Sequence, residues 1–532
     1  MDEQERLERR AHIRLIITEV LMVFAVVFLV GFLTLVVMGY SFNLYEIGGE
    51  GEVVERAGLA QMSSVPAGAT IEIDGGVPLL LRTNASRTLS SGEHKIKFMR
   101  DGFFSWEKTI NIVEGMVYRV NYPRLILKER EAEEFALFSE EEEPEFLTVS
   151  PNKERMIVLV EKKLYLVELN SNKPELKELG LVRADKDGTK TALNVETAEN
   201  AKWSGNSERV LLRLNGEYVV VNVRNPEETV YFSELRAVEG AGEASETKST
   251  WAEEKTVEFL KLEFESEAGE RLIGLTGERE LAEISLREKT ISEPLAENII
   301  KFDNDGERVV FLTRAEEDVE EEVEVSGDEA EGAGETSEAE EAEEKLPFEV
   351  RAYRVGEEES HLVVGVKTEE TRVSTMRYFQ DSYILVAEGE EIKVFAGSWP
   401  VKDGAMKEIF SEEVGFETKK IEKRGKGMVF QIKGEDDEAV FDIEAEKIVR
   451  EKTEEEANEE ETEKVIERGW VDEFLRYEIL EGGRLKILDY DWINEIEIRE
   501  SGVETGKIVT VSGNNRFIYY FSDGKLVREK IL

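Results

Sequence analysis

The chain has 532 residues, a formal net charge of −49 and no cysteine. Nucleic acid is not an expected partner, because phosphate binding needs a basic face and the sequence offers none. The cysteine count excludes disulfides and thiolate metal sites, so core packing must hold the domains together, as suits a prokaryotic envelope protein.

Near the N-terminus, residues 20–38 form a run of nineteen uncharged and mostly apolar side chains. A helix of this length covers roughly 28 Å, which matches the hydrocarbon core of a bilayer. Four arginines precede the run and the fifteen residues after Tyr40 contain no Lys or Arg, so the N-terminus should remain in the cytoplasm. We predict a cytoplasmic stub over 1–14 and a transmembrane helix over 15–40.

Two alternatives to this membrane span fit less well. A cleaved signal peptide has an apolar core of about 7–15 residues and a small-residue cleavage site, which does not follow here. A buried core helix would need a domain around it, and fourteen flanking residues cannot supply one. The expected location is therefore the cell membrane, with a single pass and residues 41–532 extracytoplasmic.

A compact all-β module is expected after a linker over 41–61. Pro66 and Gly68 indicate a turn, residues 70–74 alternate as a strand does, and a second turn follows. Pro66-Ala67-Gly68-Ala69 resembles the Pro-Glu-Gly-Ala motif of PEGA domains, with Ala67 in place of the acid. Asp101-Gly102-Phe103 and Trp106 also follow in the family's order. The resemblance covers 62–128 and implies a small β-sandwich with a spacer or binding role, although other small β-sandwiches share such turns.

A repeated turn dominates the rest of the chain. The ungapped copies are 149–155, 203–209 and 302–308, with a shorter version at 511–516 and a weak echo at 378–382. Each has an apolar anchor, a small or acidic turn residue, an Asn or Asp that tolerates left-handed geometry, and then a buried strand. The pattern resembles the Trp-Ser-Pro-Asp-Gly-type repeat of TolB-like, WD40-like β-propellers. Two β-sandwiches in series would not explain the repetition.

The predicted fold class is an all-β ectodomain, a small β-sandwich plus a seven- or eight-bladed β-propeller, on a single N-terminal transmembrane helix. An acidic linker is expected over 129–145 and the propeller over 146–532, with acidic disordered loops at 314–346 and 451–464. The strand groups suggest blades at 146–180, 197–236, 250–296, 298–368, 373–411, 416–450, 467–499 and 501–532.

Few residues suggest chemistry. The three histidines, His12, His94 and His361, are scattered, and neither a nucleophile elbow nor a zinc motif occurs. We therefore expect no enzyme, no catalytic residue and no cofactor.

Asp303, Asp305 and Glu307 resemble the start of a calcium loop, since oxygen ligands at alternate positions suit a hard cation. However, the same positions recur as turns in the other copies, and Arg314 stands where an EF-hand has its distal Glu. The turn interpretation is therefore preferred.

Two tryptophans near predicted loops, Trp251 and Trp399, are candidates for a ligand face. Trp106 and Trp203 occupy family or repeat positions and are expected in the core.

The sequence thus predicts a membrane-anchored, exported envelope protein that acts as a binding or scaffolding platform for protein or glycan partners and contacts the lipid bilayer through 15–40. The alternative is a propeller-type hydrolase or lyase acting on cell-envelope glycans. That alternative needs a carboxylate pair or His361 in a channel pocket.

Overall fold

The structure is a computed structural model. It describes residues 17–31, 34, 40–42, 54–76, 82–138, 144–184, 189–237, 257–315, 347–355, 360–378, 381–398, 406–424, 429–435, 437–443, 447–450 and 464–532. These divide into two compact units, 1–131 with 530–532, and 132–529. Each unit is described by itself.

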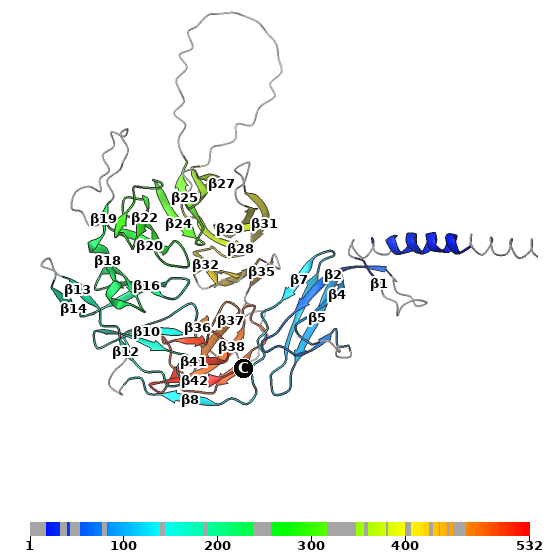
Figure 1. Ribbon diagram of the computed structural model, residues 1–532, viewed down its shortest axis with the longest axis horizontal. Helices are drawn as coiled ribbons and strands as arrows, with labels where there is room; N and C mark the ends of the chain where they lie inside the picture. The colour runs from blue at the N-terminus through cyan, green and yellow to red at the C-terminus, as the bar shows by residue number, and fades with distance from the viewer. Residues whose placement is uncertain are drawn as a thin grey trace, which may run out of the picture. The chain divides into compact units, whose positions relative to one another are not determined.

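The described part of the N-terminal apolar segment is a helix over residues 17–31, drawn in dark blue in Figure 1. From Ile17 to Val30 it carries eleven large apolar side chains that are each more than half exposed. Among the residues described, no helix combines the length and apolarity that a membrane crossing requires. The predicted span 15–40 lies partly outside the described residues, and the predicted stub 1–14 lies wholly outside them.

Two small sheets form the rest of the first unit. One has the order β1-β2-β4 with β7 beside β2, and the other has the order β3-β5-β6. The strands are β1 (Tyr40–Phe42), β2 (Val54–Met62), β3 (Thr70–Ile73), β4 (Ala85–Ser90), β5 (Gly92–Met99), β6 (Trp106–Ile112) and β7 (Val117–Val120). The predicted linker 41–61 is therefore wrong at both ends. Residues 41–42 belong to β1 and residues 54–61 belong to β2, and these two strands pair with each other.

The core of this sandwich is built around Trp106, which is 2% exposed. Its ring stacks on Phe98 with the ring centres 5.2 Å apart and meets Tyr122 edge-on at 5.8 Å. Such aromatic pairs add stabilisation beyond the area they bury. The prediction that Trp106 is a core residue is confirmed.

The described strands of the second unit form eight large sheets, each built on four antiparallel strands, and one two-stranded hairpin. In chain order the first four contain β9 (Phe146–Val149), β10 (Arg155–Val160), β11 (Lys163–Glu168), β12 (Lys177–Glu178); β15 (Ala198–Trp203), β16 (Arg209–Leu214), β17 (Glu217–Asn222), β18 (Val230–Tyr231); β20 (Phe259–Phe264), β21 (Arg271–Thr276), β22 (Leu281–Ser285), β23 (Thr290–Ile291); β24 (Ile299–Asn304), β25 (Arg308–Arg314), β26 (Phe348–Arg354), β27 (His361–Val366). The last four contain β28 (Arg372–Tyr378), β29 (Asp381–Glu388), β30 (Glu391–Ser398), β31 (Lys407–Glu413); β32 (Lys420–Arg424), β33 (Val429–Lys433), β34 (Glu438–Asp442), β35 (Lys447–Arg450); β36 (Val465–Trp470), β37 (Leu475–Leu480), β38 (Arg484–Asp489), β39 (Ile496–Arg499); β40 (Val509–Val511), β41 (Phe517–Ser522), β42 (Lys525–Lys530) and β8 (Ala132–Phe135).

Short elements fill the connections between sheets. They are the hairpin β13 (Val182–Ala184) and β14 (Lys190–Ala192), the 3₁₀ turns Pro226–Glu228 and Phe232–Glu234, and β19 (Arg236–Ala237), which runs parallel to β23.

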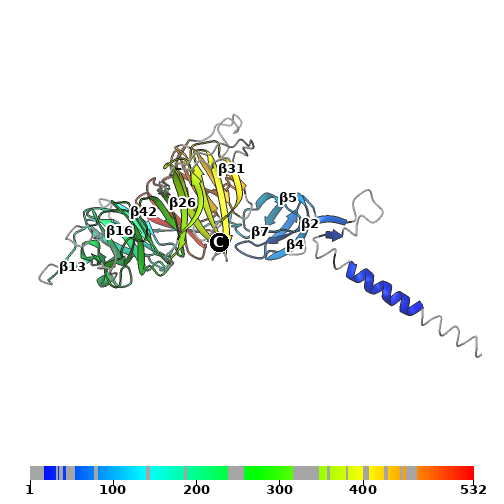
Figure 2. The same ribbon diagram turned by 90° about the horizontal axis from the view of Figure 1, so that it is seen from above.

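The eight sheets follow one another around a ring (Figure 1, and Figure 2 from above). The first strands of successive sheets contact each other through most of the series. The sixth and seventh sheets are joined by the hydroxyl of Tyr490, 2.6 Å from Asp442 Oδ2. The eighth and first share a core in which Met156 and Val158 pack with Tyr519 and Phe521. This is a closed β-propeller of eight blades, which resolves the predicted seven or eight.

Ring closure depends on β8, because this strand from the start of the unit pairs with β42 from its end. The predicted acidic linker 129–145 is therefore wrong over Ala132–Phe135, and the propeller begins earlier than residue 146. Pairing the first strand with the last sheet removes the free edges at which a ring could open.

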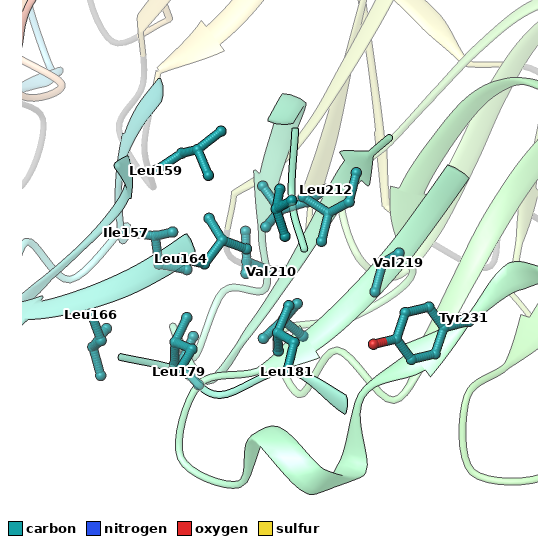
Figure 3. Packing of buried hydrophobic residues seen from close by; sticks show 14 residues of the cluster. Ile157, Leu159, Leu164, Leu166, Leu179, Leu181, Val210, Leu212, Val219 and Tyr231 are labelled. Carbon is teal, nitrogen blue, oxygen red and sulfur yellow. The ribbon is translucent and has the colours of Figure 1, made fainter. Parts of the chain in front are cut away.

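Apolar side chains fill the space between neighbouring blades, as Figure 3 shows for the first and second. Ile157 and Leu159 of β10 face Val210 and Leu212 of β16, and all four are at most 1% exposed. Trp203 packs against this cluster and donates from Nε1 to Thr148 Oγ1 at 3.0 Å. Trp203 therefore belongs to the core between the first two blades, as predicted.

The repeated turn joins the first and second strands of a blade. Ser150, Ser204 and Ser512 are fully buried, and each hydroxyl accepts the backbone N–H of the residue that starts the second strand. The left-handed residue is not the expected Asn but the one after it, with φ near +60° at Lys153, Ser207 and Asn515. The reason is that the Asn side chain closes the turn itself, by accepting an N–H two residues on.

The third ungapped copy folds differently. Asp305 donates its N–H to Arg308 O, whereas Ser204 donates to Arg209 O, so this turn is shorter by two residues. Asp305 Oδ1 accepts the N–H groups of Glu307 and Arg308 at 2.9 and 2.8 Å. A carboxylate here replaces the Ser–Asn pair of the longer turns.

Candidate functional site

Charged side chains gather where the innermost strands of the propeller end, next to the repeated turns. Lys202 comes from β15, Lys261 and Glu263 from β20, Asp303 from β24 and Lys423 from β32. We call these five residues the inner-strand cluster. They come from four blades, and a fifth blade contributes Ser374 Oγ and Thr375 N, which donate to Asp303 at 3.1 and 2.9 Å.

The cluster alternates in charge. Glu263 Oε1 lies 2.9 Å from Lys261 Nζ and 3.3 Å from Lys202 Nζ, while Asp303 Oδ2 lies 3.5 Å from Lys423 Nζ. Burial alone would raise the pKa of Glu263, but the three lysines together lower it to about 2. Both carboxylates are outnumbered by cations, so the cluster carries a net positive charge within a strongly acidic chain.

A cavity of ≈ 480 Å³ lies beside the inner ends of the first, seventh and eighth blades. Its lining includes Lys153 from the first repeated turn, Trp470 at the end of β36, Lys507, and Thr510 in β40. We call this recess the Trp470 cavity.

Lys153 is the distinctive residue of the Trp470 cavity. Burial lowers the pKa of its ammonium, and nearby Arg424 lowers it further while Asp472 opposes the shift. Among the described residues its ammonium has no ion pair or hydrogen-bond partner. The residue also holds φ +59°, a geometry that L residues other than Gly, Asn and Asp seldom adopt.

Trp470 is held between cations. The guanidinium carbons of Arg424 and Arg476 lie 5.0 and 4.9 Å from its ring centre. Arg476 is only 2% exposed, and its Nη2 donates to Glu438 Oε2 at 2.9 Å. Arg424 also forms an ion pair with Glu422 at 2.7 Å, so carboxylates balance both arginines. The Trp470 ring gives the cavity an aromatic wall, and the charged residues of its lining are Lys153, Lys507 and Glu145.

The calcium candidates do not converge on one point. Asp303 belongs to the inner-strand cluster, Asp305 caps its own turn, and Glu307 forms ion pairs with Arg354 at 2.7 Å and with Arg377. Across the part of the chain that the structure describes, no group of three or more acidic or His side chains could hold a metal ion.

The other predicted candidates are placed as follows. Trp251 and Trp399 lie outside the described residues. His361 begins β27, the outermost strand of the fourth blade, and does not line the Trp470 cavity.

A Ser–His–Asp group that the sequence did not suggest occurs in the first unit. His94 Nδ1 lies 2.7 Å from Asp74 Oδ2, and Nε2 lies 2.9 Å from the carbonyl oxygen of Ser90 and 3.3 Å from its hydroxyl. Both ring nitrogens therefore face oxygen atoms, and the oxygen nearest to Nε2 is a backbone carbonyl, which can only accept. A general base would have to accept the serine proton at Nε2, so this arrangement ties β3, β4 and β5 together structurally.

A second recess, of ≈ 760 Å³, lies in the first unit and is lined by four cations and one carboxylate. Its walls include the motif residues Ala67 and Gly68. Arg100 donates to Ala67 O at 2.6 Å and lies over the Phe103 ring at 5.2 Å. The lining cations are Arg82, Lys97, Arg100 and Lys128, and we call this recess the basic groove. The sequence signal for it was a local excess of Lys and Arg, hidden by the acidity of the whole chain.

Comparison with known proteins supports the division of the chain. Residues 59–125 match the family model described as PEGA domain. The chain therefore carries a PEGA domain, and the strand pairing of 132–529 makes it a PEGA-domain protein with an eight-bladed β-propeller.

Similar solved structures include the computationally designed Ika8 protein, at 9% identity and a TM-score of 0.38 over 75% of this chain and 99% of that one. The C-terminal WD40 domain of Sif2 has 9% identity and a TM-score of 0.37 over 74% and 99% of the two chains. The N-terminal domain of Nup159 has 12% identity and a TM-score of 0.30 over 75% and 90%. No curated protein matches the chain.

Proposed function

We propose that this protein is a membrane-anchored, extracytoplasmic binding platform, whose propeller holds an acidic group of an envelope protein or glycan partner in the Trp470 cavity. The observation that carries the proposal is Lys153: a partly buried ammonium without a partner among the described residues, beside a cavity, in a chain of net charge −49. An ammonium that lines a cavity and has no carboxylate partner among the described residues is available to an acidic ligand.

The surroundings of Lys153 support the same ligand chemistry. Lys507 lines the same cavity, and the inner-strand cluster carries a net positive charge. The basic groove of the PEGA domain is a second recess of the same sign. A carboxylate-bearing or phosphate-bearing partner would be drawn to these recesses and repelled by the rest of the surface, which gives orientation as well as affinity.

Membrane anchoring through residues 15–40 is part of the proposal. Its support is the apolar run 20–38, the arginines before it, and the exposed apolar side chains of the helix over 17–31. We propose no catalytic activity. The glycan hydrolase or lyase alternative needs a carboxylate pair or His361 in a channel pocket. His361 lies on an outermost strand, and the carboxylates of Glu263 and Asp303 are held by lysines of the inner-strand cluster.

The test is site-specific photo-crosslinking in the native cells. A photoreactive amino acid replaces Lys507, which lines the Trp470 cavity, and in a matched strain it replaces Lys177 on the outermost strand β12. We expect a discrete crosslinked product from position 507 that is absent at 177 and at least five-fold weaker when Lys153→Met is added. Protease digestion then separates a protein partner from a glycan. Equal products from both positions, or a product unaffected by Lys153→Met, would overturn the proposal.

A further inference from the structure

Three apolar side chains stand exposed at one turn of the PEGA domain. Val113, Met116 and Val117 are 54%, 60% and 45% exposed, and they flank the turn between β6 and β7. We call these three residues the apolar tip. A cluster of exposed apolar side chains on a small domain marks an interaction surface more often than chance.

The turn that carries the apolar tip is rigidly placed. Gly115 donates its N–H to Ala57 O at 2.9 Å, and Met116 O accepts the N–H of Leu59 at 2.9 Å. Gly115 holds φ +71°, and a Cβ at Gly58 would meet Val113 O at 2.5 Å, so two glycines allow the close approach of the turn to β2. The apolar side chains are thus fixed in place on the end of a sheet.

The strand register places the apolar tip near Tyr40, where the chain enters the domain after the apolar run 20–38. β1 pairs with β2 so that Tyr40 lies opposite Arg56, and Ala57, which accepts the bond from the turn, is the next residue. Tyr40 in turn follows Met38, the last residue of the apolar run 20–38, by two positions. Two residues of extended chain span at most about 7 Å, so this end of the domain must stay close to wherever the apolar run lies.

The charge of the domain permits a membrane surface as partner. Between residues 59 and 125 the sequence has eight basic and six acidic side chains, a net charge of +2, in a chain whose total is −49. Anionic headgroups therefore would not repel the domain as a whole as they would the acidic remainder, and the exposed carboxylate of Glu114, between Val113 and Met116, has to remain at the level of the headgroups.

We propose that the apolar tip inserts into the interfacial layer of the bilayer and docks the PEGA domain on the membrane surface. The proposal rests on the membrane anchoring in the proposed function, which brings the bilayer within reach. The three side chains then leave water for the boundary between headgroups and acyl chains, where apolar side chains of peripheral segments are stable. The tethered domain would stand on two supports, the helix and the tip.

The test uses the absence of native cysteine. Met116→Cys is labelled with an environment-sensitive fluorophore in the full chain, which is reconstituted in nanodiscs of phosphatidylethanolamine and phosphatidylglycerol with or without brominated acyl chains. The matched control is Ser105→Cys, an exposed residue just before β6 and thus at the opposite end of that strand. Bromine quenches only a label that contacts the acyl region.

We expect a blue-shifted emission and at least three-fold stronger bromolipid quenching at 116 than at 105. Adding Val113→Glu and Val117→Glu should lower the bromolipid quenching at 116 to the value at 105. Equal quenching at 116 and 105 in the unchanged chain would overturn the proposal. A label at 116 that is shielded from aqueous iodide but not quenched by bromolipid would overturn it too, since a protein surface would then cover the tip. Failure of the full chain to enter nanodiscs would instead refute the anchoring.

Discussion

At the scale of single residues, Lys153 combines two unfavourable features. Its φ of +59° is shared by Ser207 and Asn515 at the equivalent positions of other turns, but neither of those carries a long charged side chain. Backbone of this kind costs on the order of 1–3 kcal/mol for most residues with a side chain, and here the repeated turn imposes it. A serine or an asparagine meets the same requirement at the other two turns, so the turn alone does not call for a lysine that lines a cavity.

We predict that Lys153→Gly raises the stability of the propeller by about 1–2 kcal/mol, because glycine adopts the left-handed geometry without strain. Because burial lowers the pKa of Lys153 below its unfolded value, the folded state binds fewer protons there and stability rises with pH between the two pKa values. The stability gained by Lys153→Gly should therefore be largest at neutral pH and should become smaller as the pH approaches the ordinary pKa of lysine. Urea denaturation of the full chain across this pH range measures it.

The matched control for that prediction is Asn515→Gly, at the equivalent position of the last turn. Asn tolerates the left-handed geometry, so this change should give at most a small gain without pH dependence and should leave the photo-crosslink at position 507 intact. A Lys153→Gly protein less stable than its parent would show that the ammonium has a stabilising partner.

At the scale of elements, the repeated turns also connect neighbouring blades. Asn152 N donates to Ser207 Oγ at 3.1 Å, and Arg155 Nη1 donates to Ser207 O at 3.0 Å, so the first turn holds the second. The second turn holds the third blade in the same way, through Asn206 N to Glu267 O and Arg209 Nη1 to Ala268 O. The sequence repeat therefore encodes both the strand reversal and the joint between blades.

Ser204→Ala should lower the stability of the propeller by about 1–3 kcal/mol, since it leaves buried polar groups without their partner. Ser204 is fully buried, and its hydroxyl accepts from Arg209 N at 2.9 Å. Ser171→Ala is the control, because that hydroxyl also makes a local turn bond but the residue is only partly buried. Thermal unfolding followed by tryptophan fluorescence compares the two, and an equal effect would contradict the role assigned to the buried hydroxyl.

The sequence predicted the blades well because every blade buries apolar strands in a repeated order. It failed at β8, since Ala132-Glu133-Glu134-Phe135 has no clear alternation and its partner strand lies at the other end of the unit. The candidate site was missed for a related reason. Lys202, Lys261 and Lys423 each looked like the polar face of an ordinary strand, and only the closed ring brings them together. A Lys shortly before the turn in several inner strands was the available signal.

At the scale of the whole molecule, closure by β8 joins the two ends of the propeller. Lys530 N donates to Glu131 O, and bonded pairs alternate along an antiparallel ladder, so the N–H of Glu133 points at Arg528. Glu133→Pro removes this ladder N–H and should open the eighth sheet. We expect a loss of about 2–4 kcal/mol and rapid proteolysis between β39 and β42, whereas Glu133→Ala loses the same side chain but keeps the backbone pairing and should remain resistant. Limited proteolysis of the full chain distinguishes these outcomes, and a resistant Glu133→Pro protein would show that the ring does not depend on β8.

In a chain of net charge −49, lysines and arginines line the Trp470 cavity and the basic groove. The central claim is that an acidic group of a partner binds in the Trp470 cavity beside Lys153. Its most direct test is amine-reactive labelling of the full chain in native membranes, before and after a high-salt wash, with Lys190 of the exposed strand β14 as reference. The account predicts that Lys153 is protected before the wash and modified after it, while Lys190 is modified in both. Equal modification of Lys153 under both conditions would contradict the claim.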